Sequence, residues 1–160
     1  MSLTVTLRDV RDEDLDTFFA HQQDEVAVQM AAFVSEDPSD RGAFDQHWQK
    51  IRAHEQIVIR SIEVEDRLVG HICSFVGFGE LELTYWIDRA DWGRGIATAA
   101  LASFLEEQTE RPSFARASKD NVGSIRVLEK CGFEHLRDER GFANARGEEI
   151  DEVVYQRTAR

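Results

Sequence analysis

Residues 57–76 constrain the fold more than any other part of the chain. Two successive extended runs, 57–64 and 68–76, carry apolar residues on both faces and are joined by a polar turn at residues 65–67. This arrangement predicts a pair of antiparallel strands. Because a strand that is apolar on both sides has to be covered on both sides, we expect helices on both faces of the sheet.

Hydrophobic spacing predicts the elements around this strand pair. Further strands are expected at residues 3–8, 81–87, 114–118, 133–140 and 150–157. Two helices are expected between the first two strands: one starts at Asp12 or Glu13 with an apolar stripe that continues to Phe33, and the other is capped by Ser39 or Asp40. Two later helices are expected at residues 95–110 and 121–131, the second stopped by Gly132. The predicted class is α/β, with a mixed, mostly antiparallel central sheet flanked by helices on both faces and one late βαβ crossover.

The length and the charge of the chain limit its class. A chain of 160 residues is typical of one domain, so residues 1–160 are expected to form a single domain. With 31 Asp and Glu against 19 Lys and Arg, the net charge is −12, and no run of Lys or Arg offsets it locally. We therefore expect no nucleic-acid partner and no membrane partner, whereas a cationic small molecule would be attracted.

Cysteine and histidine usage predicts a reducing compartment and no metal site. Cys73 and Cys131 lie in apolar runs without the CxxC or Cys/His spacing of metal ligands, so both are expected to be buried free thiols. The five histidines lack HExxH or another paired ligand spacing, so no metal is expected. No stretch reaches the roughly 18 apolar residues of a membrane span, and no targeting segment is evident, so the expected location is cytoplasmic.

Residues 85–98 form the segment most typical of ligand binding. A predicted strand runs through the turn Gly93-Arg94-Gly95 directly into a helix. The first turn of a helix has unpaired N–H groups and the positive end of the helix dipole, and both favour a phosphate group. A tight strand-to-helix turn without any ligand explains the same residues equally well. A nucleotide-binding domain is disfavoured, because Thr98 replaces the third glycine of the dinucleotide fingerprint and no P-loop GKS or GKT is present.

A second segment, residues 121–133, carries a further motif, although on its own Asn121 is an ordinary helix N-cap. The pattern WGxGIAT at residues 92–98, followed later by NxxSxxxLEKxGF, resembles the GCN5-related N-acetyltransferase (GNAT) family. The stretches TLRDVRDEDL near the start and GEEIDEVVYQR near the end are similar to its RimJ/RimL-like branch, the ribosomal-protein N-terminal acetyltransferases. The resemblance therefore covers nearly the whole chain.

The resemblance implies the GNAT fold, in which acetyl-CoA lies between two splayed strands. The strand end at Trp86 and Ile87 would pair with the pantetheine arm, and Asn121 would touch the cofactor from the following helix. The pyrophosphate would bind the backbone of the turn made by Trp92, Gly93, Arg94, Gly95, Ile96, Ala97 and Thr98. Because the family often dimerises, a homodimer is also an expectation.

The resemblance further implies direct acetyl transfer to a primary amine, either a peptide N-terminus or a small cationic molecule. Leu128 occupies the position where many members carry a Tyr that protonates the departing thiolate. Ser124 is the remaining hydroxyl on that helix, and the RimL-like branch is thought to use the matching Ser. Three side chains are candidates for the base that takes the amine proton: Glu82, which matches an acidic residue of the branch, Glu80 on the same strand face, and His71. Leu128 also leaves open a catalytically idle acyl-CoA-binding sensor or interaction module.

Overall fold

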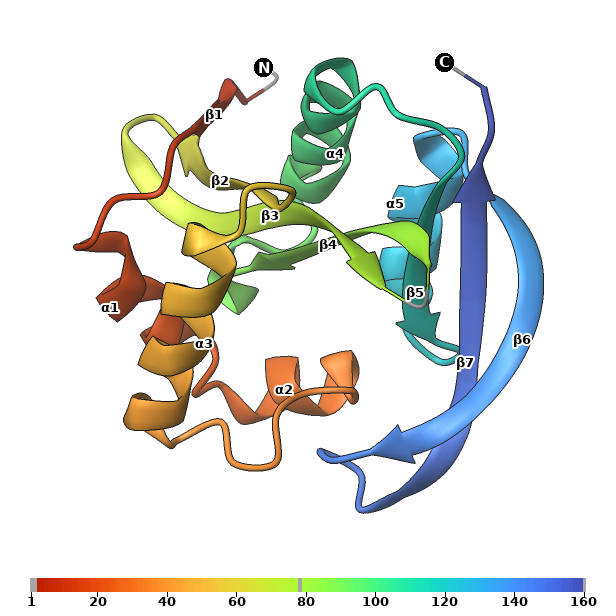
Figure 1. Ribbon diagram of the computed structural model, residues 1–160, viewed down its shortest axis with the longest axis horizontal. Helices are drawn as coiled ribbons and strands as arrows, with labels where there is room; N and C mark the ends of the chain where they lie inside the picture. Colours follow the sequence, from red (N-terminus) through yellow and green to blue (C-terminus); the bar gives the residue numbers. More distant parts are fainter. Residues whose placement is uncertain (1–2, 78, 160) are drawn as a thin grey trace.

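The computed structural model describes residues 3–77 and 79–159, which build a seven-stranded sheet with helices on both faces (Figure 1). The strands are β1 (Val5–Arg8), β2 (Val58–Val64), β3 (Arg67–Gly77), β4 (Glu80–Ile87), β5 (Ser113–Ser118), β6 (Glu134–Ala143) and β7 (Glu148–Arg157). The helices are α1 (Asp14–His21), α2 (Glu25–Ala31), α3 (Arg41–Ala53), α4 (Ile96–Glu107) and α5 (Val122–Lys130), with a 3-10 turn, η1, at Arg89–Asp91. The predicted class, a mixed sheet between helical layers, is confirmed.

The connection between β4 and β5 creates the feature that matters most for function. The strand order is β1-β2-β3-β4-β5-β7-β6, and β4 and β5 pair in parallel across the crossover helix α4, while the other neighbours are antiparallel. Among the described residues, β4 and β5 are in register only at Glu82 and Phe114, and the two strands then turn apart (Figure 1). The β5-facing edge of β4 beyond Glu82 therefore lies outside the strand pairing, which confirms the predicted splayed pair.

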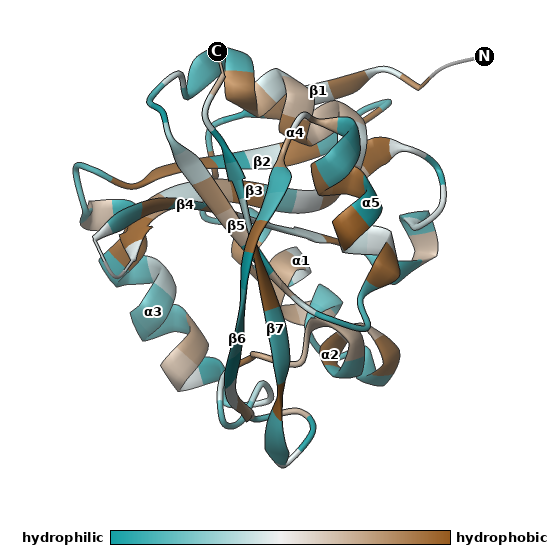
Figure 2. Ribbon diagram, turned by 90° about the vertical axis from the view of Figure 1, so that its right-hand side faces the viewer, coloured by the Kyte–Doolittle hydropathy of each residue, from teal (hydrophilic) through white to brown (hydrophobic). Residues whose placement is uncertain are grey.

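Two apolar cores hold the helices against the sheet. On one face, α4 and α5 bury Phe104 and Leu128, and on the other face α1 and α3 bury Phe18 and Trp48. Burying each such side chain stabilises the fold by roughly 1.5–3 kcal/mol. Both faces of β2 and β3 are thus covered, as their apolar composition requires, whereas Figure 2 shows hydrophilic residues along much of the edge strand β6.

The region before β2 differs from the prediction. Three helices lie here within the described residues, not two, because the expected first helix is interrupted and a new one begins after Asp24. The Asp24 carboxylate accepts the N–H of Ala27 at 2.9 Å and caps α2. α2 ends at Ala31, before the predicted Phe33, because Ala32 leaves the helical path with a φ of 63°.

Other element boundaries move by a few residues. Asp40 caps α3, not Ser39, and accepts the N–H of Ala43 at 3.0 Å. α4 ends at Glu107, so the predicted helix was three residues too long. The C-terminal hairpin is longer than predicted, because β6 and β7 continue pairing up to a short turn at residues 144–147.

Two local predictions are confirmed. Gly132 ends α5 with a φ of 87°, and the N–H of the next residue, Phe133, returns to the Leu128 carbonyl at 3.0 Å. Cys73 and Cys131 are both buried free thiols. Their position in the cores explains why they lie in apolar runs.

Two other kinds of feature do not occur in residues 3–77 and 79–159. No helix there has both the length and the apolar composition needed to cross a lipid bilayer. No three His, Cys, Asp or Glu side chains in the same ranges gather in a way that could hold a metal ion.

Candidate active site

The splayed strands open onto a cleft of about 450 Å³ at the end of β4. Its walls come from the end of β4, the turn and first residues of α4, one side of α5, and α2. Of the ten residues predicted to hold the cofactor, nine line this cleft: Trp86, Ile87, Trp92, Gly93, Gly95, Ile96, Ala97, Thr98 and Asn121. The fold therefore brings the two sequence segments that carry the family resemblance to one place.

The wall formed by α4 has the features of an anion-binding site. Gly93 and Gly95 adopt φ angles of 76° and 78°, a region that only glycine enters at little cost. Gly95 is the N-cap of α4, and no side chain in the described ranges caps this helix. The N–H groups of residues 96–98 therefore lack helical acceptors and stand at the positive end of the dipole. Such a helix start is suited to a phosphate group.

Asp91 holds the turn before α4 in place. Its buried carboxylate accepts hydrogen bonds from Arg67 at 2.6 and 2.7 Å and from Arg94 at 2.7 Å. The hydrogen bonds from Arg67 lower the pKa of Asp91, so the carboxylate stays ionised. Two guanidinium groups around one carboxylate leave one positive charge beside the helix start. Arg94 thus lies outside the lining of the cleft, where its hydrogen bond anchors the turn.

Two cationic residues that the sequence analysis did not single out also line the cleft. Arg126 and Lys130 are four positions apart on α5, which places them on one side of the helix. Neither forms an ion pair with any residue in the described ranges. Their spacing in the predicted helix was a signal that could have identified them. They add positive charge to the wall that faces α4.

Two hydroxyl groups meet inside the cleft. Tyr85 Oη lies 2.8 Å from Ser124 Oγ, and both residues line the cavity. The Ser124 N–H donates to the side-chain oxygen of Asn121 at 3.2 Å, so the helix cap fixes the position of the serine. Burial raises the pKa of Tyr85 to about 12. Leu128, at the position of the missing tyrosine, is buried in the core and does not face the cleft.

A comparison with protein families identifies the chain. The acetyltransferase (GNAT) domain matches residues 4–134, which is most of the sequence. The chain belongs to the GNAT acetyltransferase family. A comparison of this acetyltransferase with curated proteins gives no match.

Solved structures share the fold of this acetyltransferase. RimJ from Mycobacterium smegmatis, in complex with CoA-disulfide, has a TM-score of 0.83 at 22% identity, over 99% of this chain and 85% of its own. RimL, a ribosomal L7/L12 alpha-N-protein acetyltransferase in complex with coenzyme A, has a TM-score of 0.81 at 16% identity. The match covers 97% of this chain and 94% of the RimL chain. A chimera of the spermidine N-acetyltransferase SpeG from Vibrio cholerae and hSSAT has a TM-score of 0.76 at 15% identity. The match covers 96% of this chain and 95% of the chimera. At these identities the likeness establishes the common fold.

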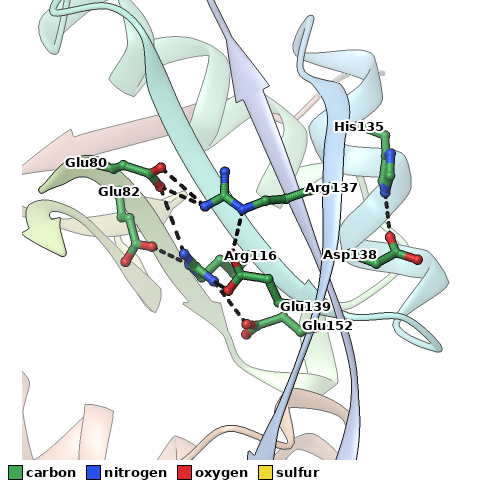
Figure 3. A network of polar contacts seen from close by, with 8 residues as sticks. All are labelled: Glu80, Glu82, Arg116, His135, Arg137, Asp138, Glu139 and Glu152. Atoms are coloured by element: carbon green, nitrogen blue, oxygen red, sulfur yellow. Dashed lines mark hydrogen bonds and ion pairs between the residues drawn. The ribbon is translucent and has the colours of Figure 1, made fainter. Parts of the chain in front are cut away.

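Glu82, the first candidate base of this acetyltransferase, lies beside the cleft and not in its lining. It occupies the position where β4 and β5 separate, and only 6% of the residue is exposed. Its Oε1 accepts a hydrogen bond from Arg116 Nε at 2.5 Å (Figure 3). The arginine therefore fixes the direction of the carboxylate at the apex of the split.

The ion-pair network around Glu82 carries an excess of negative charge. It joins residues of β4, β5, β6 and β7, namely Glu80, Glu82, Arg116, Arg137, Glu139 and Glu152 (Figure 3). Hydrogen bonds from Arg137 and Arg116 lower the pKa of Glu139, whereas burial raises the pKa of Glu152. Four carboxylates against two guanidinium groups leave two negative charges on this side of the sheet.

His71, another candidate base, is enclosed by aromatic side chains. Its ring centroid lies 4.7 Å from that of Phe18 and 5.0 Å from that of Trp48. Its Nδ1 is buried and has no hydrogen-bond partner within the described ranges. Burial, together with the nearby His21 and His47, lowers the pKa of His71 to about 3. The ring is therefore neutral at pH 7, and among the described residues it lies outside the lining of the cleft.

Proposed function

We propose that the chain is a single acetyl-CoA-dependent N-acetyltransferase domain that passes the acetyl group directly to a primary amine. The observation that carries this proposal is the cleft itself. It joins an uncapped helix start, a free strand edge and a pair of hydroxyl groups in one cavity of about 450 Å³. A phosphate seat, a backbone edge and a hydrogen-bond donor are what a CoA thioester needs in order to be held and cleaved.

The residues of the cleft fit acetyl-CoA along its length. The N–H groups of residues 96–98 would hold the pyrophosphate, and Arg126 and Lys130 would attract the remaining phosphate charge. The free edge of β4 near Trp86 and Ile87 would pair with the pantetheine amides. A main-chain N–H at this edge would also polarise the thioester carbonyl.

Acetyl transfer requires that the amine lose a proton, since an α-amino group has a pKa near 7.7–8.0 and a lysine side chain near 10.4. Glu82 is our candidate for the base, acting through a water molecule, because its carboxylate is held at the apex of the split by Arg116. Ser124 is the candidate for the group that meets the departing sulfur, since its hydroxyl lines the cleft. No covalent enzyme intermediate is needed in this scheme.

The acceptor is a peptide N-terminus or a small cationic amine. The excess of two carboxylates in the network around Arg116 and Arg137 supports a positively charged acceptor, because it lowers the potential on that side of β4. The net charge of −12 acts in the same direction at longer range. RimL and SpeG, which share the fold, are described as acting on a protein N-terminus and on spermidine.

The proposal is tested by the release of free CoA, monitored with a thiol reagent, across a panel of peptides, polyamines and amino sugars. We expect amine-dependent release by the wild type, and a loss of release in Ser124→Ala without a loss of acetyl-CoA binding. If acetyl-CoA binds but no amine triggers release, the chain is an acyl-CoA-binding module without catalysis, and the proposal is wrong.

A further inference from the structure

We propose that Tyr85 is a positioning residue for acetyl transfer: its hydroxyl donates a hydrogen bond to Ser124 Oγ and thereby directs the serine proton at the sulfur that leaves. This inference rests on the proposed function, because it assumes that a CoA thioester occupies the cleft. It adds a residue from strand β4 to a role that the family resemblance assigns only to helix α5.

The geometry of the pair carries the inference. The two oxygens are 2.8 Å apart, which is the usual distance of an O–H···O hydrogen bond. Ser124 is fixed by the cap of its helix, through its N–H bond to Asn121 at 3.2 Å. The ring of Tyr85 packs against the core beneath α4 and α5, so its hydroxyl is fixed as well. Both side chains nevertheless line the cleft.

The direction of the hydrogen bond decides what the serine can do. A serine hydroxyl has one proton, and in a helix it commonly turns back toward a carbonyl of the preceding turn. A phenol is a better donor than an aliphatic alcohol, and with a pKa of about 12 Tyr85 keeps its proton at neutral pH. When Tyr85 donates to Ser124, the oxygen of the serine is satisfied as an acceptor and its proton is free to point into the cleft.

The pair acts by hydrogen bonding and loses no proton. During transfer the N–C bond forms, the C–S bond breaks, and its electron pair stays on the sulfur as a thiolate. The amine proton passes to the base, and a proton from solvent later restores the thiol. A thiol has a pKa near 8.5, far below that of Tyr85, so the thiolate cannot take the phenolic proton favourably. The hydroxyl pair instead stabilises the negative charge as it develops on the sulfur.

This role accounts for Leu128. The position on α5 where many family members carry a tyrosine is apolar here and buried in the core. A tyrosine hydroxyl nevertheless reaches the helix, because β4 supplies it from the opposite wall of the cleft. The tyrosine hydroxyl at this helix therefore comes from another element and acts by hydrogen bonding through Ser124.

The test needs no knowledge of the acceptor. The thiol of CoA bound to the protein is titrated by the ultraviolet absorbance of its thiolate, in the wild type, Tyr85→Phe and Ser124→Ala. We expect the ionisation constant of the bound thiol to fall about tenfold in either variant, since a hydrogen bond to a charged group is lost. Tyr155→Phe, which alters the other tyrosine of the chain on β7 and outside the cleft, is the matched control and should not change it.

Activity with any amine that is accepted gives a second measurement. Tyr85→Phe should lower kcat about tenfold and change KM for acetyl-CoA less than about threefold. The double variant Tyr85→Phe/Ser124→Ala should be no slower than Ser124→Ala, because Tyr85 acts through the serine.

Three results would overturn the inference. An unchanged thiol pKa in both single variants, with CoA still bound, removes the role of the pair and leaves the proposed function intact. Multiplying effects in the double variant would show that Tyr85 acts independently of Ser124. Failure of the wild type to bind CoA would overturn the proposed function itself, and the inference with it.

Discussion

Glu82, which pairs with Phe114 where β4 and β5 are in register, accepts a hydrogen bond of 2.5 Å from Arg116, two residues further along β5. Just beyond this position the two strands part and the cleft begins. The ion pair therefore places the candidate base next to the start of the cleft proposed to bind acetyl-CoA. It also explains why a glutamate residue that is only 6% exposed is tolerated there, since a buried charge needs a partner.

This placement predicts the behaviour of Glu82→Gln. The amide still accepts the Arg116 hydrogen bond, so the free energy of unfolding should change by only about 1 kcal/mol. The variant cannot take a proton, so kcat should fall by about 10²-fold or more. Glu80→Gln, on the same face of β4, is the control and should retain most of the activity. Urea denaturation and steady-state kinetics measure the two quantities, and equal kcat losses in both variants would contradict the role of Glu82.

The glycine turn before α4 gives a second prediction. Gly95→Val forces a side chain into a φ of 78°, which costs about 1–2 kcal/mol, and it crowds the proposed phosphate seat. We expect the affinity for acetyl-CoA to fall by about tenfold or more, which corresponds to about 1.4 kcal/mol of binding free energy. Gly147→Val is a matched control, because Gly147 has a φ of 67° in the β6–β7 turn, outside the cleft.

Thermal denaturation and calorimetric titration together separate strain from binding. Both glycine variants should lose comparable stability, and only Gly95→Val should lose affinity. Undiminished affinity in Gly95→Val would remove the helix start from the binding site.

The fold and the part of the candidate site around the turn before α4 were predictable, because they depend on local sequence. The apolar runs of β2 and β3 require two helical layers, and the turn around Gly95 requires a helix start next to a strand end. The division of the N-terminal helical region into α1 and α2 was not predictable in the same way. The apolar residues continue at helical spacing through this region, and only the capping of α2 by Asp24 starts a new helix there.

The rest of the candidate site depends on contacts between residues that are far apart in the sequence. Tyr85 and Ser124 are 39 positions apart, and their meeting depends on how far β4 and β5 diverge. Arg94 lies in the predicted binding turn, yet its direction is set by Asp91, which Arg67 from the start of β3 holds in place. Spacing along the chain carries no information about such distances.

The two cations on α5 give a third prediction. Arg126→Gln and Lys130→Gln should each raise the Kd for acetyl-CoA about fivefold, because each removes an exposed attraction to phosphate. The loss should shrink as the salt concentration rises, since salt screens exposed charges. Lys50→Gln on α3, outside the cleft, changes the net charge equally and should leave the Kd unchanged. An equal effect of all three variants would mean that only the overall charge matters.

The buried His71 predicts a dependence of stability on pH. Its pKa is about 3 in the folded protein against 6.5 in an unfolded chain, so below pH 6.5 only the unfolded state binds the proton. The contribution of the neutral His71 ring to the free energy of unfolding is complete above pH 6.5. It is lost by about 1.4 kcal/mol per pH unit as the pH falls toward 3. His21 and His47, whose pKa values burial also lowers, add slopes of the same sign.

Replacing His71 by Gln should therefore flatten the fall in unfolding free energy between pH 6.5 and 5, as measured by urea denaturation at several pH values. A wild-type stability that does not vary over this range would mean that His71 is protonated in the folded protein.

In the proposed reaction, acetyl-CoA bound in the β4–β5 cleft gives its acetyl group directly to an amine. The most direct measurement uses isotope-labelled acetyl-CoA with an amine that triggers CoA release, and follows acetylated amine and free CoA together by mass spectrometry. We expect one labelled acetyl group on the amine for every CoA released, with none left on the protein. CoA released without acetylated amine, or a labelled acetyl group retained on the protein, would contradict it.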